Sequence, residues 1–254
     1  MNIPEVLEQV VEILNKEIEN PILGIYLYGS SVSGGLRPDS DIDLLVIVKG
    51  RLEKRNKLEL IKQFLQVSGE IGNRELIRPL EITIVNIDEI SPWLHPIKSE
   101  LQYGEWLRDK FSKGQTGGSA TDPDLTILMR QVRQNSISLA GPEAQELVPT
   151  IPDEDIKNAI FDSFPALENS VIGDERNAIL TFARMVFTIV TGEITSKEKA
   201  ADWLLPKVPQ HFNGLLQMAK DGYLGECKDN WESKDEEVRE FVQYLVQLAH
   251  KRNK

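Results

Sequence analysis

The sequence predicts an α+β fold, in which a mixed-sheet domain over residues 1–150 precedes an α-helical domain over residues 151–254. Short apolar runs typical of strands occur only in the first part, where segments with helical spacing separate them. The second part shows helical spacing and no convincing strand pattern. The composition also changes at Pro142, Pro149 and Pro152, which follow one another closely. Because prolines are common in linkers, we place the domain boundary there.

The first domain is predicted to contain three helices and three strands. They are, in chain order, a helix over 6–18, strands over 22–28 and 41–48, a helix over 58–67, a strand over 80–85 and a helix over 125–139. The first helix should end before Asn20-Pro21, since proline disfavours helical backbone in the residue that precedes it. Residues 112–124, rich in Gly and Ser, are expected to form a loop.

In the second domain the strongest helical signal is the apolar stretch 178–190, which is expected to end at Gly192. Thr195 and Glu198 have the spacing of a capping box ahead of the next helix. A final helix over 238–246 is followed by basic residues, where the helix dipole favours positive charge. We therefore expect a helical bundle.

The charge balance restricts the class of partner. Lys and Arg total 29 and Asp and Glu total 40, which gives a formal net charge of −11. Proteins that bind nucleic acid normally present a basic face, because contacts to phosphates supply most of the affinity. The only dense basic stretch here is 250–252. We therefore expect no nucleic-acid partner, and a small, positively charged substrate.

Other bulk features indicate the compartment. The chain has no run of about 18 apolar residues, so we expect no membrane partner. Residues 1–20 lack the apolar core of a signal peptide. The single cysteine, Cys227, cannot form an internal disulfide and fits a reducing compartment. We expect a cytoplasmic monomer.

A Gly-Ser pair followed by two closely spaced aspartates is the most informative motif. It consists of Gly29-Ser30 and, at the start of a predicted strand, Asp41-Ile42-Asp43. Side chains alternate along a strand, so the two aspartates point the same way. Such a pair is repulsive unless a cation lies between the carboxylates, and Mg²⁺ commonly binds through one or two carboxylates plus substrate phosphates. The Gly-Ser turn offers N–H groups and a hydroxyl to those phosphates. The motif therefore predicts a metal–nucleotide site.

Three competing interpretations of this motif fit less well. The chain contains no Gly-x-x-x-x-Gly-Lys sequence, which excludes a Walker motif. An aspartyl-phosphate phosphatase would place its Asp-x-Asp after an apolar strand, whereas here the strand follows. Solvent-facing aspartates on an edge strand are the third interpretation. However, the strand continues as the apolar run 44–48, which is typical of a strand buried on both faces.

Glu81 is the expected third acidic residue. It lies in the apolar strand 80–85 and reaches the same site if this strand neighbours the one that begins at Asp41. In nucleotidyl transfer, a carboxylate can take the proton from the attacking hydroxyl. Glu81 is therefore the candidate general base, and the alternative is an exposed strand glutamate.

Residues 25–48 and 78–85 resemble the polymerase-β-type nucleotidyltransferase superfamily and, more closely, the bacterial aminoglycoside adenylyltransferases. The Gly-Ser and Asp-x-Asp motif is typical of the superfamily alone. Six further stretches resemble the narrower family: Gly34-Gly35-Leu36, Arg78-Pro79-Leu80-Glu81, Gly104-Glu105-Trp106, Asn135-Ser136, Gly173-Asp174-Glu175-Arg176-Asn177 and Ala200-Ala201-Asp202-Trp203. The resemblance implies a two-domain enzyme that uses ATP and Mg²⁺ to transfer AMP onto an antibiotic hydroxyl.

In the first domain, the resemblance assigns roles to the motif residues. Asp41 and Asp43 would hold Mg²⁺. Ser30 and Ser40 would contact the phosphates of ATP. Glu81 would activate the hydroxyl of the antibiotic and contact it.

Five residues outside the motif also receive roles by resemblance. Arg184, Lys197 and Tyr223 would bind the nucleotide. Trp106 and Asp174 would line the antibiotic site. Each has a simpler alternative: a salt bridge for Arg184, a solvated lysine for Lys197, ring packing for Tyr223, core packing for Trp106 and a helix N-cap for Asp174.

One departure from the family pattern indicates the substrate. Relatives that also accept streptomycin carry a Trp and an Asp just before the position of Gly173, and residues 164–172 contain neither. We therefore expect an enzyme that adenylylates the 9-hydroxyl of spectinomycin, releases pyrophosphate and confers antibiotic resistance. The alternatives are a dual-specificity streptomycin 3''/spectinomycin 9 adenylyltransferase, a polymerase or tRNA-end nucleotidyltransferase, and a non-catalytic nucleotide-binding regulator.

Overall fold

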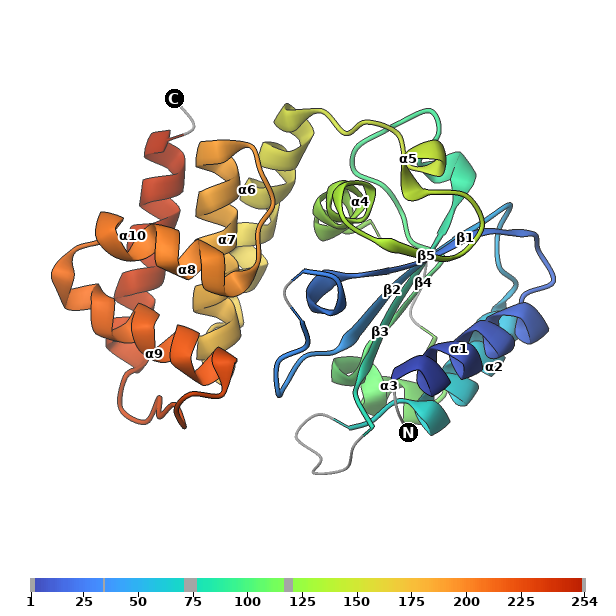
Figure 1. Cartoon of the computed structure of the whole chain (residues 1–254), viewed down its shortest axis with the longest axis horizontal. Helices are drawn as coiled ribbons and strands as arrows, with labels where there is room; N and C mark the ends of the chain where they lie inside the picture. Colours follow the sequence, from blue (N-terminus) through green and yellow to red (C-terminus); the bar gives the residue numbers. More distant parts are fainter. Residues whose placement is uncertain (1–2, 34, 71–76, 117–120, 253–254) are drawn as a thin grey trace. The chain divides into compact units, whose positions relative to one another are not determined.

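The computed structural model describes residues 3–33, 35–70, 77–116 and 121–252, and the chain divides into two compact units, Met1–Pro152 and Asp153–Lys254 (Figure 1). The first unit contains a mixed five-stranded sheet with flanking helices, and the described residues of the second form helices. The predicted α+β class, with a mixed-sheet domain followed by a helical one, is confirmed. Among the helices of the described residues, none combines the length and the apolar character needed to span a membrane.

The sheet of the first unit has the strand order β4-β3-β2-β1-β5. The strands are β1 (Ile22–Tyr28), β2 (Ile42–Val48), β3 (Leu80–Asn86), β4 (Leu101–Tyr103) and β5 (Ile137–Ala140). β2 and β3 are parallel, whereas the other neighbouring strands are antiparallel. The three predicted strands are confirmed as β1, β2 and β3, because their continuous apolar runs suit strands that are buried on both faces.

Helices lie on both sides of this sheet. Those of the first unit are α1 (Ile3–Glu17), α2 (Lys54–Val67), α3 (Arg108–Ser112), α4 (Asp124–Gln134) and α5 (Ala144–Leu147). Buried residues of α1 and α2, among them Val10 and Phe64, share one core cluster with Leu44 of β2 and Ile82 of β3. Figure 1 shows α4 and α5 on the opposite side of the sheet. Side chains alternate along a strand, so the strand residues that point away from this core face the side of α4 and α5.

The segment 125–139 differs from the prediction. The helix α4 ends at Gln134, and Ile137–Ala140 pairs with β1 as the edge strand β5. Asn135 has extended backbone, with φ −152° and ψ 94°, which ends the helix. The prediction of helix over its last residues is wrong because the pairing partner, the edge of β1, lies far away in the sequence and leaves no trace in local periodicity.

The second unit is built around one central helix. Its helices are α6 (Asp153–Asn169), α7 (Glu175–Thr191), α8 (Lys197–Leu204), α9 (Asn213–Leu224) and α10 (Asp235–Arg252). α7 contacts each of the other four, which explains its strongly apolar sequence. It ends, as predicted, at Gly192, whose φ of +76° is the left-handed conformation that glycine favours. Short 3-10 segments complete the chain: η1 (Gly29–Ser31), η2 (Ile87–Glu89), η3 (Glu105–Leu107), η4 (Leu205–Lys207) and η5 (Gln210–Phe212).

The predicted capping box at the start of α8 is wrong. Ser196 and not Thr195 occupies the N-cap position, and its side chain makes no capping hydrogen bond. Ser196 Oγ is buried without a hydrogen-bond partner. Two adjacent residues of N-cap type preceded the helix, and spacing alone could not choose between them.

Candidate active site

Two of the expected acidic residues lie side by side on the parallel strand pair. Asp43 of β2 and Glu81 of β3 are register partners. The next pair along the strands, Leu44 and Ile82, belongs to the core under α1 and α2. Because strand residues alternate, Asp43 and Glu81 face the opposite side of the sheet, where both are partly exposed. The register thus places the expected metal ligand beside the expected general base.

Asp41 lies immediately before β2 and two residues before Asp43. Ile42, between them, is fully buried, and its backbone N–H donates to the carbonyl of Pro79 at 2.9 Å. This bond ties the start of β2 to the start of β3. The expected metal ligands therefore lie at the beginning of β2, next to the beginning of the strand that carries Glu81.

The turn after β1 is packed directly against Asp43. Tyr28, the last residue of β1, is the register partner of Asp43, and Gly29 then turns the chain with a φ of +71°. A Cβ atom on Gly29 would lie 1.9 Å from Oδ2 of Asp43. Glycine is therefore required here for two reasons: it adopts this backbone conformation without strain, and it leaves room for the carboxylate of Asp43. Ser30 follows in η1 and is half-buried, so the predicted phosphate contact lies beside the predicted metal ligand.

The loop before β2 is held by an arginine that the sequence analysis did not single out. Arg78 Nη1 donates to the carbonyl oxygens of Arg37 at 2.8 Å and Ser40 at 2.9 Å. Ser40 is buried, and its Oγ accepts the backbone N–H of Arg37 at 3.0 Å. Arg78 occurs in the sequence only as part of a family-like stretch, because a side chain that binds carbonyls of a distant loop has no local signature.

Trp106 lies at the same end of the sheet as Glu81. It belongs to η3, which follows β4, and β4 pairs antiparallel with β3 through the partners Ile82 and Tyr103. Continuing this register by one residue puts Gly104 opposite Glu81. Trp106 is 56% exposed, so the alternative of core packing is wrong for this side chain.

In the second unit, Asn177 connects two of the predicted residues, Asp174 and Lys197, and Lys197 in turn lies near a third, Tyr223. Asn177 Nδ2 donates to Oδ1 of Asp174 at 2.8 Å, and Lys197 Nζ donates to Oδ1 of Asn177 at 3.2 Å. Lys197 Nζ also lies 5.5 Å from the ring centroid of Tyr223. Asp174 occupies the N-cap position of α7 but makes no side-chain capping bond there. Asn177 was not among the predicted site residues. Its position three residues after Asp174, at the start of a helix, does indicate that the two side chains are neighbours.

Arg184 interrupts the apolar sequence of α7 and is half-buried between the buried residues Ala183 and Met185. It follows Asn177 by seven residues, which is about two helical turns. The two side chains therefore project from the same face of α7. Arg184 thus lies on the same face of α7 as Asn177.

A partly buried carboxylate, Asp229, fixes the chain near Tyr223. Asp229 accepts hydrogen bonds from Arg176 Nε at 2.8 Å and from Trp231 Nε1 at 2.6 Å. Burial acts to raise the pKa of Asp229, but the hydrogen bonds of Trp231 and Arg176 outweigh it and lower the pKa below its usual value. A Cβ on Gly222 would lie 2.8 Å from Cγ of Asp229, so the Asp229 carboxylate packs on α9 at the residue directly before Tyr223. The sequence carries no local pattern that indicates this contact.

The donor set suits Mg²⁺ bound together with a nucleotide. Among the described residues, no group of three or more His, Cys, Asp or Glu side chains is arranged to hold a metal ion. Mg²⁺ does not need such a cage, since it typically binds through one or two carboxylates and completes its shell with phosphates and water. Asp41 and Asp43 would supply the carboxylates, and the close contact of Gly29 with Asp43 places the Gly29-Ser30 turn next to Asp43.

The fold and this arrangement are those of a nucleotidyltransferase: a Gly-Ser turn, an aspartate pair and a further carboxylate on the adjacent parallel strand. Residues 7–107 match the family described as nucleotidyltransferase domain. Residues 146–248 match the family described as aminoglycoside adenylyltransferase, C-terminal domain.

Relatives cover almost the whole chain. It is 45% identical to a spectinomycin 9-adenylyltransferase of Staphylococcus aureus, over 96% of this chain and 94% of the relative. The spectinomycin 9-adenylyltransferase of Campylobacter jejuni is 47% identical, over 95% of this chain and 93% of the relative. The aminoglycoside (3'') (9) adenylyltransferase of Escherichia coli is 40% identical, over 94% and 92%.

A solved structure agrees with these relatives. The crystal structure of spectinomycin adenyltransferase AAD(9) from Enterococcus faecialis with ATP and spectinomycin superposes with a TM-score of 0.93 and 34% identity, covering 98% of this chain and 100% of that one. The chain belongs to the aminoglycoside adenylyltransferase family, and it is an enzyme of the nucleotidyltransferase class. The resemblance inferred from its motifs is confirmed.

Proposed function

We propose that this enzyme transfers AMP from ATP to the 9-hydroxyl of spectinomycin, releases pyrophosphate and thereby confers resistance to the antibiotic. The observation that carries the proposal is the in-register pair of Asp43 and Glu81, with Gly29 packed against Asp43. This pair supplies a metal ligand and a proton acceptor on one face of the sheet. The proposed substrate is that in the names of two relatives, the spectinomycin 9-adenylyltransferases at 45% and 47% identity.

The residues of the first unit would divide the chemistry among them. Asp41 and Asp43 would hold Mg²⁺, which when bound neutralises charge on the phosphates of ATP. Ser30 and Ser40 would bind and orient the phosphates. The hydroxyl oxygen of the antibiotic attacks the α-phosphorus, the bond to pyrophosphate breaks, and Glu81 takes the hydroxyl proton. The protein contributes positioning and electrostatic stabilisation.

The residues of the second unit would bind the two substrates. We propose that Arg184 and Lys197 interact with the phosphates of ATP and that Tyr223 packs on the adenine. Asp174 would bind an ammonium group of the antibiotic, and we also propose Trp106 as a contact of the antibiotic. The contacts of Asn177 with Asp174 and Lys197 support this assignment, because they connect a proposed antibiotic ligand to a proposed nucleotide ligand.

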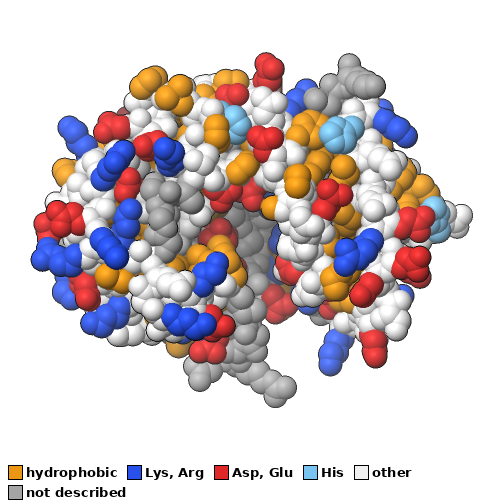
Figure 2. Space-filling model, turned by 180° about the vertical axis from the view of Figure 1, so that it is seen from behind, with side chains coloured by type: hydrophobic (Ala, Val, Ile, Leu, Met, Phe, Trp, Pro, Cys, Tyr) orange, Lys and Arg blue, Asp and Glu red, His pale blue; other side chains and the backbone are white. Residues whose placement is uncertain are grey.

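The surface charge agrees with a small cationic substrate. Lys and Arg side chains on the face shown in Figure 2 are interspersed with Asp and Glu. The net charge of −11 is unfavourable for a polyanion and favourable for the two secondary amines of spectinomycin. We therefore propose no nucleic-acid partner, and a cytoplasmic, monomeric enzyme.

A dual-specificity streptomycin 3''/spectinomycin 9 adenylyltransferase is the second candidate. The Escherichia coli relative with both specificities in its name, at 40% identity, favours it. Against it stands the segment 164–172, which has neither a Trp nor an Asp. Its Phe164 is buried against Phe161 and Phe182 and so is not free to replace the missing tryptophan.

The test is pyrophosphate release from ATP and Mg²⁺ with each antibiotic supplied separately. We expect turnover with spectinomycin, little with streptomycin and none after Asp41→Asn or Asp43→Asn. Glu81→Gln should abolish transfer while ATP still binds. Rapid streptomycin turnover would exclude the narrower specificity, activity in Asp43→Asn would exclude the metal role, and transfer by Glu81→Gln would place the base elsewhere.

A further inference from the structure

The exposed Trp106 ring rests on a glycine. A Cβ atom on Gly104 would lie 2.2 Å from Cη2 and Cζ3 of the indole and 2.6 Å from Cε3. Gly104 has extended backbone, with φ −166° and ψ 153°, which any residue adopts. The glycine is therefore required for the position of the ring and not for the course of the chain.

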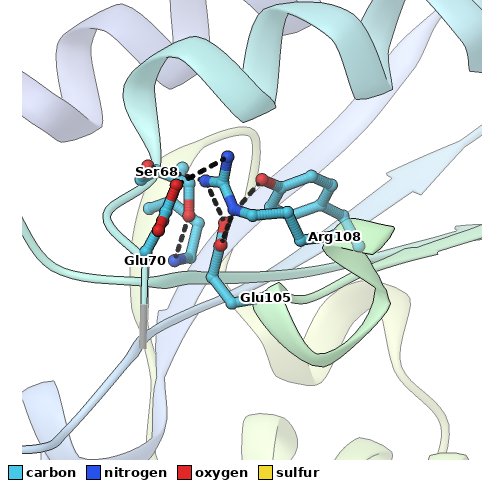
Figure 3. Close-up of polar contacts among 6 residues, drawn as sticks. Ser68, Glu70, Glu105 and Arg108 are labelled. Atoms are coloured by element: carbon cyan, nitrogen blue, oxygen red, sulfur yellow. Dashed lines mark hydrogen bonds and ion pairs between the residues drawn. The ribbon is translucent and has the colours of Figure 1, made fainter. Parts of the chain in front are cut away.

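The residue between them, Glu105, is buried and forms an ion pair with the partly exposed Arg108. The carboxylate of Glu105 accepts hydrogen bonds from the Tyr103 hydroxyl at 2.7 Å and from Nη2 of Arg108 at 3.0 Å, and it also accepts Nε of Arg108. Figure 3 shows the Arg108 guanidinium facing Glu105, with Ser68 and Glu70 pointing toward the same group. Burial and the bond to Glu105 raise the pKa of Tyr103, so its hydroxyl remains a donor.

This network extends to the strand that carries Glu81. Arg108 Nη2 donates to the backbone carbonyl of Ser68 at 3.2 Å, and Ser68 Oγ accepts the N–H of Leu80 at 3.0 Å. Leu80 directly precedes Glu81 in β3. The turn that presents Trp106 is thus tied, through Arg108 and Ser68, to the start of the strand with the proposed base.

We propose that Gly104 and the Glu105–Arg108 pair are positioning residues, which hold the Trp106 ring as a preformed surface and so determine the affinity for the antibiotic. The inference rests on the proposed function, in which the ring lines the spectinomycin site. A ring that is already in place loses little conformational freedom on binding. Its face also attracts ammonium groups such as those of the antibiotic. None of the positioning residues needs to touch the ligand.

The first test is Gly104→Ala, measured by steady-state pyrophosphate release with ATP, Mg²⁺ and spectinomycin. The added Cβ displaces the ring, and the fold is unaffected because the exposed indole can move into solvent. The KM for spectinomycin is expected to rise by about tenfold. The kcat, the KM for ATP and the melting temperature should stay at the wild-type values. A purely structural role would not produce this separation of KM from kcat.

A double-mutant cycle shows whether Gly104 acts through the ring. In a Trp106→Ala background, Gly104→Ala should have no further effect on the KM for spectinomycin. The matched control is Gly214→Ala, since a Cβ on Gly214 would meet no atom within 4 Å, and it should leave kcat and both KM values unchanged.

The ion pair is tested by two substitutions at one position. Arg108→Met leaves the Glu105 carboxylate without its charged partner and is expected to raise the KM for spectinomycin more than the KM for ATP. Arg108→Lys restores a positive charge without the two-pronged geometry and should rescue part of that loss.

Two results would overturn the inference: an unchanged KM for spectinomycin in Gly104→Ala, or effects of Gly104→Ala and Trp106→Ala that simply add. If the wild type adenylylates spectinomycin while Trp106→Ala leaves its KM unchanged, the positioning role is refuted and the proposed function stands. If the wild type does not adenylylate spectinomycin, both are refuted.

Discussion

Replacing Gly29 by alanine tests whether the close packing of the turn on Asp43 supports the proposed metal-binding role of this carboxylate. At a φ of +71° an alanine is in the left-handed region, which costs about 1–2 kcal/mol. The new Cβ would also lie 1.9 Å from Oδ2 of Asp43. An ordinary contact is about 3.4 Å, so the carboxylate must move by the difference, about 1.5 Å.

The two effects have separate readouts. The backbone cost should lower the melting temperature by roughly 2–8 °C for a chain of this size. Displacing a metal ligand by more than 1 Å is expected to reduce kcat/KM by at least about 10²-fold, or about 2.7 kcal/mol of transition-state stabilisation. Pyrophosphate release and thermal unfolding of the same preparation measure both.

The matched control is Gly192→Ala. Gly192 has nearly the same backbone, with a φ of +76°, but a Cβ there would meet no atom within 4 Å. It should therefore share the loss of stability and keep the wild-type kcat/KM. If Gly29→Ala loses no more activity than Gly192→Ala, the close packing of the turn on Asp43 has no catalytic role.

Three other substitutions test the supporting contacts. Because the pKa of Asp229 is lowered by folding, its stabilisation is complete above the unfolded-state pKa, about 4, and is lost as the pH falls through the folded-state pKa. Asp229→Asn should lower the free energy of unfolding by about 2 kcal/mol at pH 7. It should also weaken the fall of the melting temperature toward acidic pH; an unchanged pH dependence would refute this. Asn177→Ala should raise the KM for both ATP and spectinomycin by several-fold, since Lys197 loses the bond at 3.2 Å, and a change in neither KM would refute the bridging role. Arg78→Ala should lower kcat more than the melting temperature, because it frees the loop before Asp41, and a full wild-type kcat would contradict that.

The central part of the site was predictable because its geometry is local. Alternation along one strand is enough to put Asp41 and Asp43 on one side, and a third carboxylate in another apolar strand is an unusual feature. That Glu81 lies beside Asp43 required the assumption that the two strands are neighbours. The parallel pairing of β2 and β3 meets that assumption.

Features that depend on distant partners were not predictable. The edge strand β5 was assigned to a helix because its partner, β1, lies more than a hundred residues earlier in the chain. Arg78 and Asp229 bind groups from separate segments, so neither has a spacing that a sequence pattern can reveal. Contacts of this kind depend on side-chain reach in three dimensions, which periodicity does not encode.

By itself, the sequence determined the two-domain α+β class, the chemistry of the acidic motif and the family, because strand alternation, apolar periodicity and motif spacing are properties of neighbouring residues. Only the tertiary structure decided that Glu81 is the register partner of Asp43 and that Gly29 must be a glycine because a carboxylate lies against it. It also decided that the Trp106 ring rests on Gly104, next to the ion pair of Glu105 with Arg108. These facts come from close packing between segments that are far apart in the chain, and packing at atomic distances exists only once the chain has folded.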